Sequence, residues 1–207
     1  MSLYTPTHFI GTDTDAQALM HGHPFATLIT SADGEQHVTH LPLLWQEDGA
    51  HGVLLGHMAR ANPHWQAFAG GATVAVFHGP HAYISPDWYV NPAREVPTWN
   101  YAVVHAHGLP QFIEAADEKL ALIDRTTAEF EHGKAAPWTR SVDGERLQKM
   151  LGAIVAFRIP LARIEAKFKM NQNRTAGDRV RVIGKLREAA HPDLQAMAQW
   201  MEDHERS

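Results

Sequence analysis

The sequence contains no cysteine. This absence excludes disulfides, thiolate metal sites, iron–sulfur clusters and cysteine nucleophiles, and it is typical of a cytoplasmic protein. Long apolar runs are also missing. The longest uncharged stretches, residues 70–86 and 96–113, are broken by glycine, proline and histidine, so neither predicts a membrane span. Residues 1–10 show no basic region followed by an apolar core, so we expect a soluble cytoplasmic protein without a secretory signal.

The motifs of several enzyme classes are absent as well. The sequence has no Gly-x-Ser-x-Gly nucleophile motif, no Gly-x-Gly-x-x-Gly dinucleotide motif, no P-loop and no His-Glu-x-x-His zinc motif. If the protein binds a nucleotide, its binding motif is therefore neither a Rossmann motif nor a P-loop.

The balance of charge is acidic. The 207 residues include 18 Lys and Arg against 23 Asp and Glu, a formal net charge of −5 at pH 7, which argues against indiscriminate nucleic-acid binding. Basic residues nevertheless dominate between Pro160 and Ala190, and such a segment suits either an anionic ligand or a solvated helix face. No helix-turn-helix pattern is present, and only residues 179–187 form a basic stripe, so DNA binding by this chain alone finds little support.

The sequence is rich in histidine and aromatic residues between Val76 and Gly108. Their side chains combine a flat apolar body with a polar tip. A purely structural core would use Leu, Ile and Val, so we interpret this stretch as the wall of a site for a planar, partly polar ligand. Its members are His78, His81, Tyr83, Trp88, Tyr89, Trp99, Tyr101, His105 and His107.

Short strands joined by turns and an occasional helix predict a mainly β fold with α additions. The Asp33-Gly34 pair between two apolar runs predicts a hairpin, and Asn62 before Pro63 predicts a capped helix over residues 63–68. The pattern is typical of a closed or split β-barrel with helical additions. Further strands are expected at residues 72–78, 98–113, 154–159 and 163–169, and helices in the tail.

The strand around His105 and His107 carries a His-x-His spacing, which points two imidazoles to the same side and recurs in metal sites. A third ligand is needed. The position where a jelly-roll dioxygenase pattern would have a carboxylate carries Gln111, and the histidines that follow lie in helical or loop settings. We therefore predict no metal site, with partly buried histidines bonded to the backbone as the simpler interpretation.

The segment around Arg60 has the features of a phosphate site. A strand ends before Arg60, and Asn62 caps a helix whose first N–H groups are free. Helix N-termini attract anions, and the arginine fork binds phosphate oxygens in pairs. An ordinary surface turn would have the same local sequence, so the pattern alone leaves both possibilities open.

A third group of polar residues lies between Glu165 and Arg174. On an extended segment Lys167 and Lys169 share a face, and three amide side chains follow. Amides offer paired donors and acceptors that suit a heterocycle edge or a ribityl chain. A turn before a helix would explain the same residues without a ligand.

In these motifs the chain resembles the PaiB family of FMN-binding split-barrel proteins, which are often named negative transcriptional regulators. The resemblance runs nearly end to end. The order of the motifs makes it specific, although Phe168, Met170 and Asn171 depart from the family's usual Lys-Trp-Lys-Leu-Ser-Gln-Asn-Arg pattern. The matching segments are residues 4–9, 23–26, 40–42, 56–63, 79–86, 96–101, 105–108 and 167–174.

The resemblance implies a split barrel related to pyridoxamine-phosphate oxidase, with FMN held at the interface of a homodimer. It implies a barrel domain with inserted helices over residues 1–170 and a helical extension packed on it over residues 171–207. The implied phosphate ligands are Arg60 and Asn62, with Lys169 and Gln172 or Asn173 as further candidates. The implied neighbours of the ribityl chain and ring are the strand containing His40 and the segment Thr98, Trp99, Asn100 and Tyr101.

Two function classes follow from the resemblance. The first is a regulatory or redox-sensing flavin protein. The second is a small FMN-dependent oxidoreductase, such as a flavin reductase or a pyridoxamine-oxidase-like enzyme, because bound FMN carries hydride in many proteins. A haem-binding or metal-binding barrel is a weaker alternative, since a related group of split barrels binds haem. Whether the chain turns over a substrate is left open.

Overall fold

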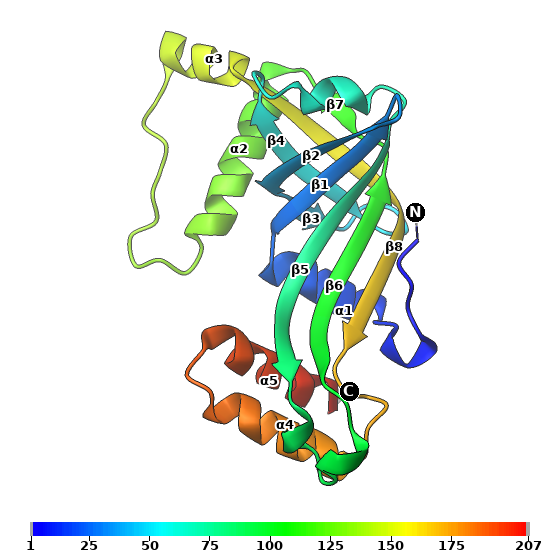
Figure 1. The fold of residues 1–207 in the computed structure, drawn as a ribbon. Coiled ribbons are helices and arrows are strands. Elements are labelled where there is room, and N and C mark those ends of the chain that lie inside the picture. Colours follow the sequence, from blue (N-terminus) through cyan, green and yellow to red (C-terminus); the bar gives the residue numbers. More distant parts are fainter. Residues whose placement is uncertain (1, 206–207) are drawn as a thin grey trace. The chain divides into compact units, whose positions relative to one another are not determined.

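The structure is a computed structural model that describes residues 2–205. Eight strands form a sheet with the order β2-β1-β5-β6-β8-β4-β3, and β7 pairs with β8 beside this path (Figure 1). The strands are β1 (Phe25–Ala32), β2 (Glu35–Pro42), β3 (Leu44–Gln46), β4 (Val53–Ala59), β5 (Ala72–Ile84), β6 (Thr98–Gly108), β7 (Gln111–Ile113) and β8 (Ile154–Lys169). This mainly antiparallel arrangement is a split barrel, as the sequence predicts.

Five α-helices and four short 3-10 helices complete the described part of the chain. The α-helices are α1 (Asp13–Gly22), α2 (Ala116–Glu131), α3 (Gly144–Gly152), α4 (Ala176–Glu188) and α5 (Pro192–Glu205). The 3-10 helices are η1 (Thr7–Phe9), η2 (Pro63–Phe68), η3 (Pro86–Trp88) and η4 (Pro92–Arg94). None of the helices in residues 2–205 combines the length and the apolar character that crossing a bilayer requires.

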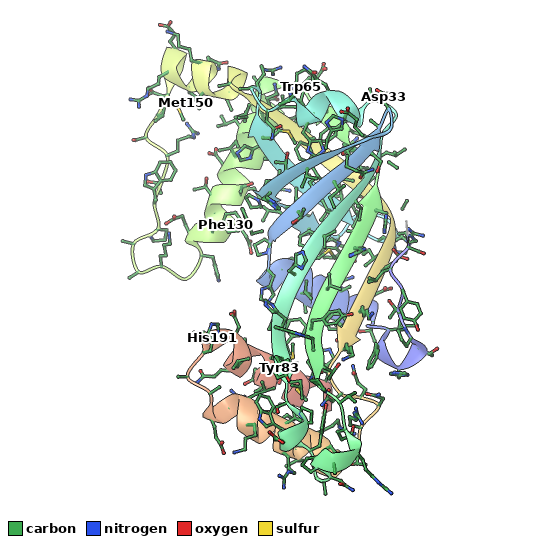
Figure 2. All side chains as sticks on the ribbon, viewed as in Figure 1. Asp33, Trp65, Tyr83, Phe130, Met150 and His191 are labelled. Atoms are coloured by element: carbon green, nitrogen blue, oxygen red, sulfur yellow. The ribbon has the colours of Figure 1, made fainter. Side chains whose placement is uncertain are left out.

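The predicted hairpin joins β1 and β2 at Asp33 and Gly34, whose positive φ angles of 51° and 81° belong to a type I′ turn. Figure 2 labels Asp33 at the tip of this hairpin. The register places Thr27 opposite His40 and Ile29 opposite Val38. Because β2 is the terminal strand of the sheet order, one of its edges pairs with no other strand of residues 2–205.

The chain divides into two compact units, of which the first comprises residues 1–19, 77–105 and 165–207. Its core contains the fully buried side chains of Leu19, Phe77, Tyr89 and Leu186. Helices α4 and α5 pack side by side within it (Figure 1). The second unit comprises residues 20–76 and 106–164, and its core includes the buried side chains of Leu28, Leu54, Phe157 and Ile159.

Three strands differ from their predicted bounds. Strand β5 continues through Gly79 and Pro80 to Ile84, and Gly79 is packed so closely that an added Cβ would lie 3.0 Å from Leu19. The strand expected over residues 98–113 breaks into β6 and β7 at Leu109 and Pro110. The two strands expected over residues 154–169 are one strand, β8, because Pro160 lies where the pairing with β4 ends and its missing N–H costs little.

Candidate functional site

Arg60 lies directly after β4 in the second unit, at the edge of a cleft. Its backbone N–H donates to Ala153 O over 2.8 Å, and its side chain reaches the same segment. Nε donates to Gly152 O over 2.8 Å and Nη2 to Ile154 O over 3.1 Å. The guanidinium is therefore fixed in orientation while its Nη1 end, which has two N–H groups, makes no hydrogen bond to any described residue.

The cleft beside Arg60 has an aromatic floor and a second cation. It has a volume of about 140 Å³. The ring centroids of Trp65 and Phe112 lie 6.1 Å apart, edge to face, and Trp65 Nε1 donates to Arg60 O (Trp65 is labelled in Figure 2). The cleft is lined by Arg60, Trp65, Phe112, Ile113, Glu114, Lys119, Val155 and Ala156. Such a lining suits a flat or apolar group that carries negative charge.

Asn62 caps η2, as its place before Pro63 predicts. Its Oδ1 accepts from the backbone N–H of His64 over 3.1 Å, and its Nδ2 donates to Thr39 Oγ1 over 3.0 Å. The amide therefore fixes the turn that follows Arg60 by contacts within the protein.

His64 is the centre of a buried polar network that the sequence analysis did not foresee. Its side chain is only 2% exposed. Nδ1 lies 2.8 Å from Thr39 Oγ1 and Nε2 lies 2.9 Å from Thr30 Oγ1, which itself contacts Thr73 Oγ1. Burial, and then the nearby imidazole of His37, lower the pKa of His64 to about 4. The ring is therefore neutral at pH 7, and both of its nitrogens are used.

His40 lies on β2 opposite Thr27, and its Nδ1 is 3.0 Å from Thr27 Oγ1 across the strand pair. This contact is on the exposed side of the hairpin. The proposed approach of His40 to a flavin is a prediction that this local geometry does not test.

Four more predicted site residues lie in the first unit, at the beginning of β6. Lys169 Nζ donates to Thr98 Oγ1 over 2.5 Å and to Trp99 O over 2.6 Å. Burial, and then the charges of Lys167 and Arg174, lower the pKa of Lys169. Sequence reasoning grouped Lys169 with Thr98 and Trp99 only through the family resemblance, and the structure places these three residues in contact.

Trp99, Asn100 and Tyr101 alternate between the faces of β6. Trp99 is 53% exposed, and its ring lies 6.1 Å from that of His81. Asn100 is fully buried on the opposite face, where Nδ2 lies 3.5 Å from Met201 Sδ and Oδ1 makes no hydrogen bond to the described residues. Tyr101 lines a cleft of about 320 Å³ together with His78, Gly79, His81, Ala102 and Val103.

The amides after β8 serve mainly the turn that leads to α4. Gln172 Oε1 accepts from the backbone N–H of Met170 over 2.7 Å, and its Nε2 donates to Phe168 O. Asn171 has a φ of 64°, and its Nδ2 donates to Tyr89 Oη over 3.2 Å. Asn173 is exposed in the same turn. The predicted flavin contacts of Gln172 and Asn173 stay predictions.

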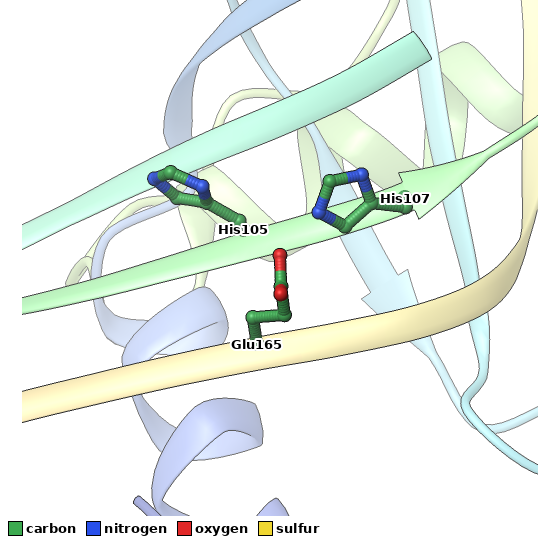
Figure 3. Close-up of side chains that lie close together, drawn as sticks. All are labelled: His105, His107 and Glu165. Carbon is green, nitrogen blue, oxygen red and sulfur yellow. The ribbon is translucent and has the colours of Figure 1, made fainter. Parts of the chain in front are cut away.

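The His-x-His pair on β6 has a carboxylate near it that the sequence analysis did not connect with the two histidines. Ligand atoms of His105, His107 and Glu165 lie within 4.8 Å of one another (Figure 3). The guanidinium of Arg163, however, lies with Nη2 3.3 Å from His107 Nε2. The guanidinium already contacts one of the three possible ligands, so we assign no metal to this group. The signal in the sequence was the β8 periodicity, which places Glu165 on the face of Lys167 and Lys169.

Comparison with known proteins identifies the family. The model of the family described as "Putative FMN-binding domain" matches residues 3–163. "Protease synthase and sporulation protein PAI 2" of Bacillus subtilis (strain 168) is 35% identical over 206 residues, with 97% of each chain covered. The chain belongs to the PaiB family. The family, and FMN as the cofactor that its description names, are as the sequence motifs predict.

Solved structures with low sequence identity share the fold of this PaiB family member. The FAD and haem binding protein of Mycobacterium smegmatis matches with a TM-score of 0.60 at 17% identity, over 82% of this chain and 77% of that chain. The flavocytochrome Anf3 of Azotobacter vinelandii matches with a TM-score of 0.60 at 16% identity, over 76% and 67%. At these identities the matches show the split-barrel fold alone.

Proposed function

We propose that this PaiB family member binds FMN through the cleft at Arg60, with the flavin phosphate on the guanidinium. The observation that carries the proposal is the geometry of Arg60. Two backbone carbonyls hold Nε and Nη2, and Nη1 has no hydrogen-bond partner in the described part of the chain. A pre-oriented guanidinium with free N–H groups fits the oxygens of a phosphate monoester.

The other residues of the cleft support this assignment. Lys119 adds a second cation against the single carboxylate of the lining, Glu114, so the lining keeps a net positive charge, and Trp65 and Phe112 offer flat apolar surface. A volume of about 140 Å³ is smaller than the roughly 300–1,000 Å³ of clefts that enclose whole ligands. The cleft therefore suits the phosphate end of FMN, while Asn62 acts through the turn that it caps.

For the remaining flavin contacts we retain the residues that the family resemblance implies. They are His40, Thr98, Trp99, Asn100, Tyr101, Lys169, Gln172 and Asn173. We also propose that the functional form is a homodimer. The exposed rings of Tyr83 and Trp99 on neighbouring strands support it, because apolar groups of this size are often covered by a partner. When bound, FMN would supply hydride or electron transfer, and the chain would supply binding and orientation.

We propose a regulatory or redox-sensing role in the cytoplasm for the FMN-bound protein, following the family resemblance. An FMN-dependent oxidoreductase is the second candidate. The cleft of about 320 Å³ beside His78, His81 and Tyr101 favours it, because a flavin enzyme must also admit a second molecule.

Titration of the chain with FMN, followed by quenching of flavin fluorescence, tests the phosphate assignment. We expect Arg60→Ala to weaken FMN binding by roughly tenfold to a hundredfold, because charge-assisted hydrogen bonds are lost. Riboflavin lacks the phosphate, so its affinity should change little. Arg146→Ala, at an exposed arginine of α3, is the matched control. Equal FMN affinity in Arg60→Ala and the wild type would overturn the assignment.

Three further measurements separate the functional roles. Repeated oxidation of NADH or NADPH in the presence of FMN would establish the enzyme, whereas binding without turnover supports the sensor. Salt-dependent binding of a defined promoter fragment would show a DNA-binding role that the net charge of −5 does not favour. Sedimentation at micromolar concentration tests the homodimer, and a monomer would contradict it.

A further inference from the structure

A second cleft in the second unit is formed by the last residues of α1, by strand β3 and by the end of α2. It has a volume of about 270 Å³. The buried side chains of Met20 and Leu43 belong to its apolar lining. It shares no lining residue with the cleft at Arg60, so the proposed binding of the flavin phosphate leaves this second cleft without a role.

Three rings line this cleft, those of His21, Trp45 and Phe130. Trp45 Nε1 donates to His51 O over 3.0 Å, and Gly52 lies so close to the indole that an added Cβ would overlap it. The ring of His21 meets that of Trp45 edge to face, with centroids 5.4 Å apart. Phe130, labelled on α2 in Figure 2, is 41% exposed and packs on no other ring in residues 2–205. The cleft therefore presents a fixed indole and an uncovered phenyl ring to a ligand.

Glu129 supplies the only carboxylate among the residues that line the cleft, and no Lys or Arg lines it. Within the described part of the chain, the Glu129 side chain accepts no hydrogen bond and forms no ion pair. Arg125 lies one turn earlier on α2, at a spacing that permits such a pair. Its Nη1 donates to Gln46 Oε1 instead. An unpaired negative charge is therefore left beside two aromatic side chains.

We propose that this cleft binds a small organic cation of the alkylammonium class, with its charge facing Glu129 and its alkyl groups against Trp45 and Phe130. Aromatic faces attract cations, most strongly those of Trp, and a carboxylate adds Coulomb attraction. The volume of about 270 Å³ is just below the roughly 300 Å³ at which clefts for drug-sized ligands begin, so the ligand is small. Its charge is opposite to that of a flavin phosphate, and the inference does not depend on FMN binding at Arg60.

Titration of the full-length protein with choline, followed by amide NMR, tests the proposal. We expect saturable shifts at the residues that line this cleft. The ammonium ion carries the charge without the methyl groups, and the carbon analogue of choline, with a tert-butyl group in place of trimethylammonium, carries the shape without the charge. Each should bind at least roughly fivefold more weakly than choline, because each lacks one half of the recognition.

Two variants test the assigned residues separately. Glu129→Gln keeps the shape of the side chain and removes its charge, and we expect it to weaken choline binding at least roughly fivefold. Phe130→Leu keeps an apolar group and removes the ring, and we expect a loss of at least about threefold. Both positions are exposed, so both variants should fold. Glu118→Gln is the matched control, since Glu118 is an exposed carboxylate in the first turn of α2 and does not line the cleft.

Several outcomes would overturn the proposal. Unchanged choline affinity in either Glu129→Gln or Phe130→Leu would remove the charge or the ring from the recognition. Equal affinity for the neutral analogue would show a plain apolar cleft. Arg60→Ala separates this proposal from the flavin site, because it should weaken FMN and leave choline unaffected. Displacement of choline by FMN would show that the cleft belongs to the flavin.

Discussion

Two polar groups of this chain, one in each unit, differ in how completely their members satisfy one another. In the second unit, His64 is neutral and buried, and both of its ring nitrogens meet threonine hydroxyls. In the first unit, Lys167 is almost as deeply buried, but within residues 2–205 its ammonium group makes one hydrogen bond, to Tyr4 O, and no ion pair. Both groups contain a buried titratable side chain.

The comparison shows that burial of a titratable residue does not by itself indicate a site. A network whose donors and acceptors are all paired stabilises the fold and leaves nothing for a ligand. A group with unbalanced charge is stabilised when a ligand supplies the missing charge. We therefore assign the His64 network to the stability of the fold.

The largest change in the free energy of unfolding is expected for a substitution at His64. We expect His64→Ala to lower the free energy of unfolding by roughly 4 kcal/mol, because it leaves a cavity and removes the partner of two buried hydroxyls. Urea denaturation measures the change. The control is His81→Ala, whose exposed ring should cost less than about 0.5 kcal/mol. Similar losses in both variants would show that the network has no special role.

The pH dependence of stability follows from the lowered pKa of His64. The unfolded chain takes up the proton near pH 6.5 and the folded chain only near pH 4. Stability contributed by the neutral ring is therefore complete above pH 6.5 and falls as the pH drops towards 4, by about 3 kcal/mol between pH 7 and pH 4. Urea denaturation as a function of pH should show this slope, and His64→Gln, which keeps a polar group without a titrating ring, should flatten it. An unchanged slope in that variant would refute the assignment.

A smaller effect is expected at the cap of η2. Asn62→Ala should lower the free energy of unfolding by roughly 1–2 kcal/mol, because the variant loses the cap to His64 N–H and the bond to Thr39. Asn91 is a matched control, since it occupies the same position before η4 without a side-chain cap bond. Thermal unfolding of both variants measures the difference. Equal effects at the two positions would mean that the cap contributes nothing.

The smallest effect on stability is expected at Lys167, in contrast to His64. Lys167→Met removes an unbalanced charge and keeps the apolar stem, so the free energy of unfolding should stay the same or rise by about 1 kcal/mol. Urea denaturation without added ligand is the measurement. A loss of more than roughly 2 kcal/mol would mean that Lys167 is compensated within the chain, and the comparison between the two groups would fail.

Local chemistry accounts for what the sequence predicts well. The Asp33-Gly34 turn and the Asn62 cap depend on neighbouring residues, and both are found where the sequence places them. The extent of β8 was missed, because Pro160 ends one pairing without ending the strand. The partners of His64 were also missed, since Thr30 lies 34 residues away in the chain. The contact of Lys167 with Tyr4 O likewise depends on the tertiary fold, because the two residues lie 163 positions apart.

In the candidate flavin site, too, the features that depend on neighbouring residues were predictable, and those that depend on contacts between distant segments were not. The strand end at Arg60 and the capping role of Asn62 follow from the sequence. The anchoring of Arg60 by Gly152 and Ile154, more than 90 residues away, does not. The same is true of Lys119 in the cleft, which local patterns have no means of placing beside Arg60.

The most direct test of the central claim, that the chain holds FMN by its phosphate at Arg60, is the visible absorption spectrum during titration with FMN. We predict a saturable change in the flavin bands for the wild type and for Arg146→Ala, and its loss at the same concentrations for Arg60→Ala. A Soret band in the purified protein, or an undiminished flavin change in Arg60→Ala, would contradict the account.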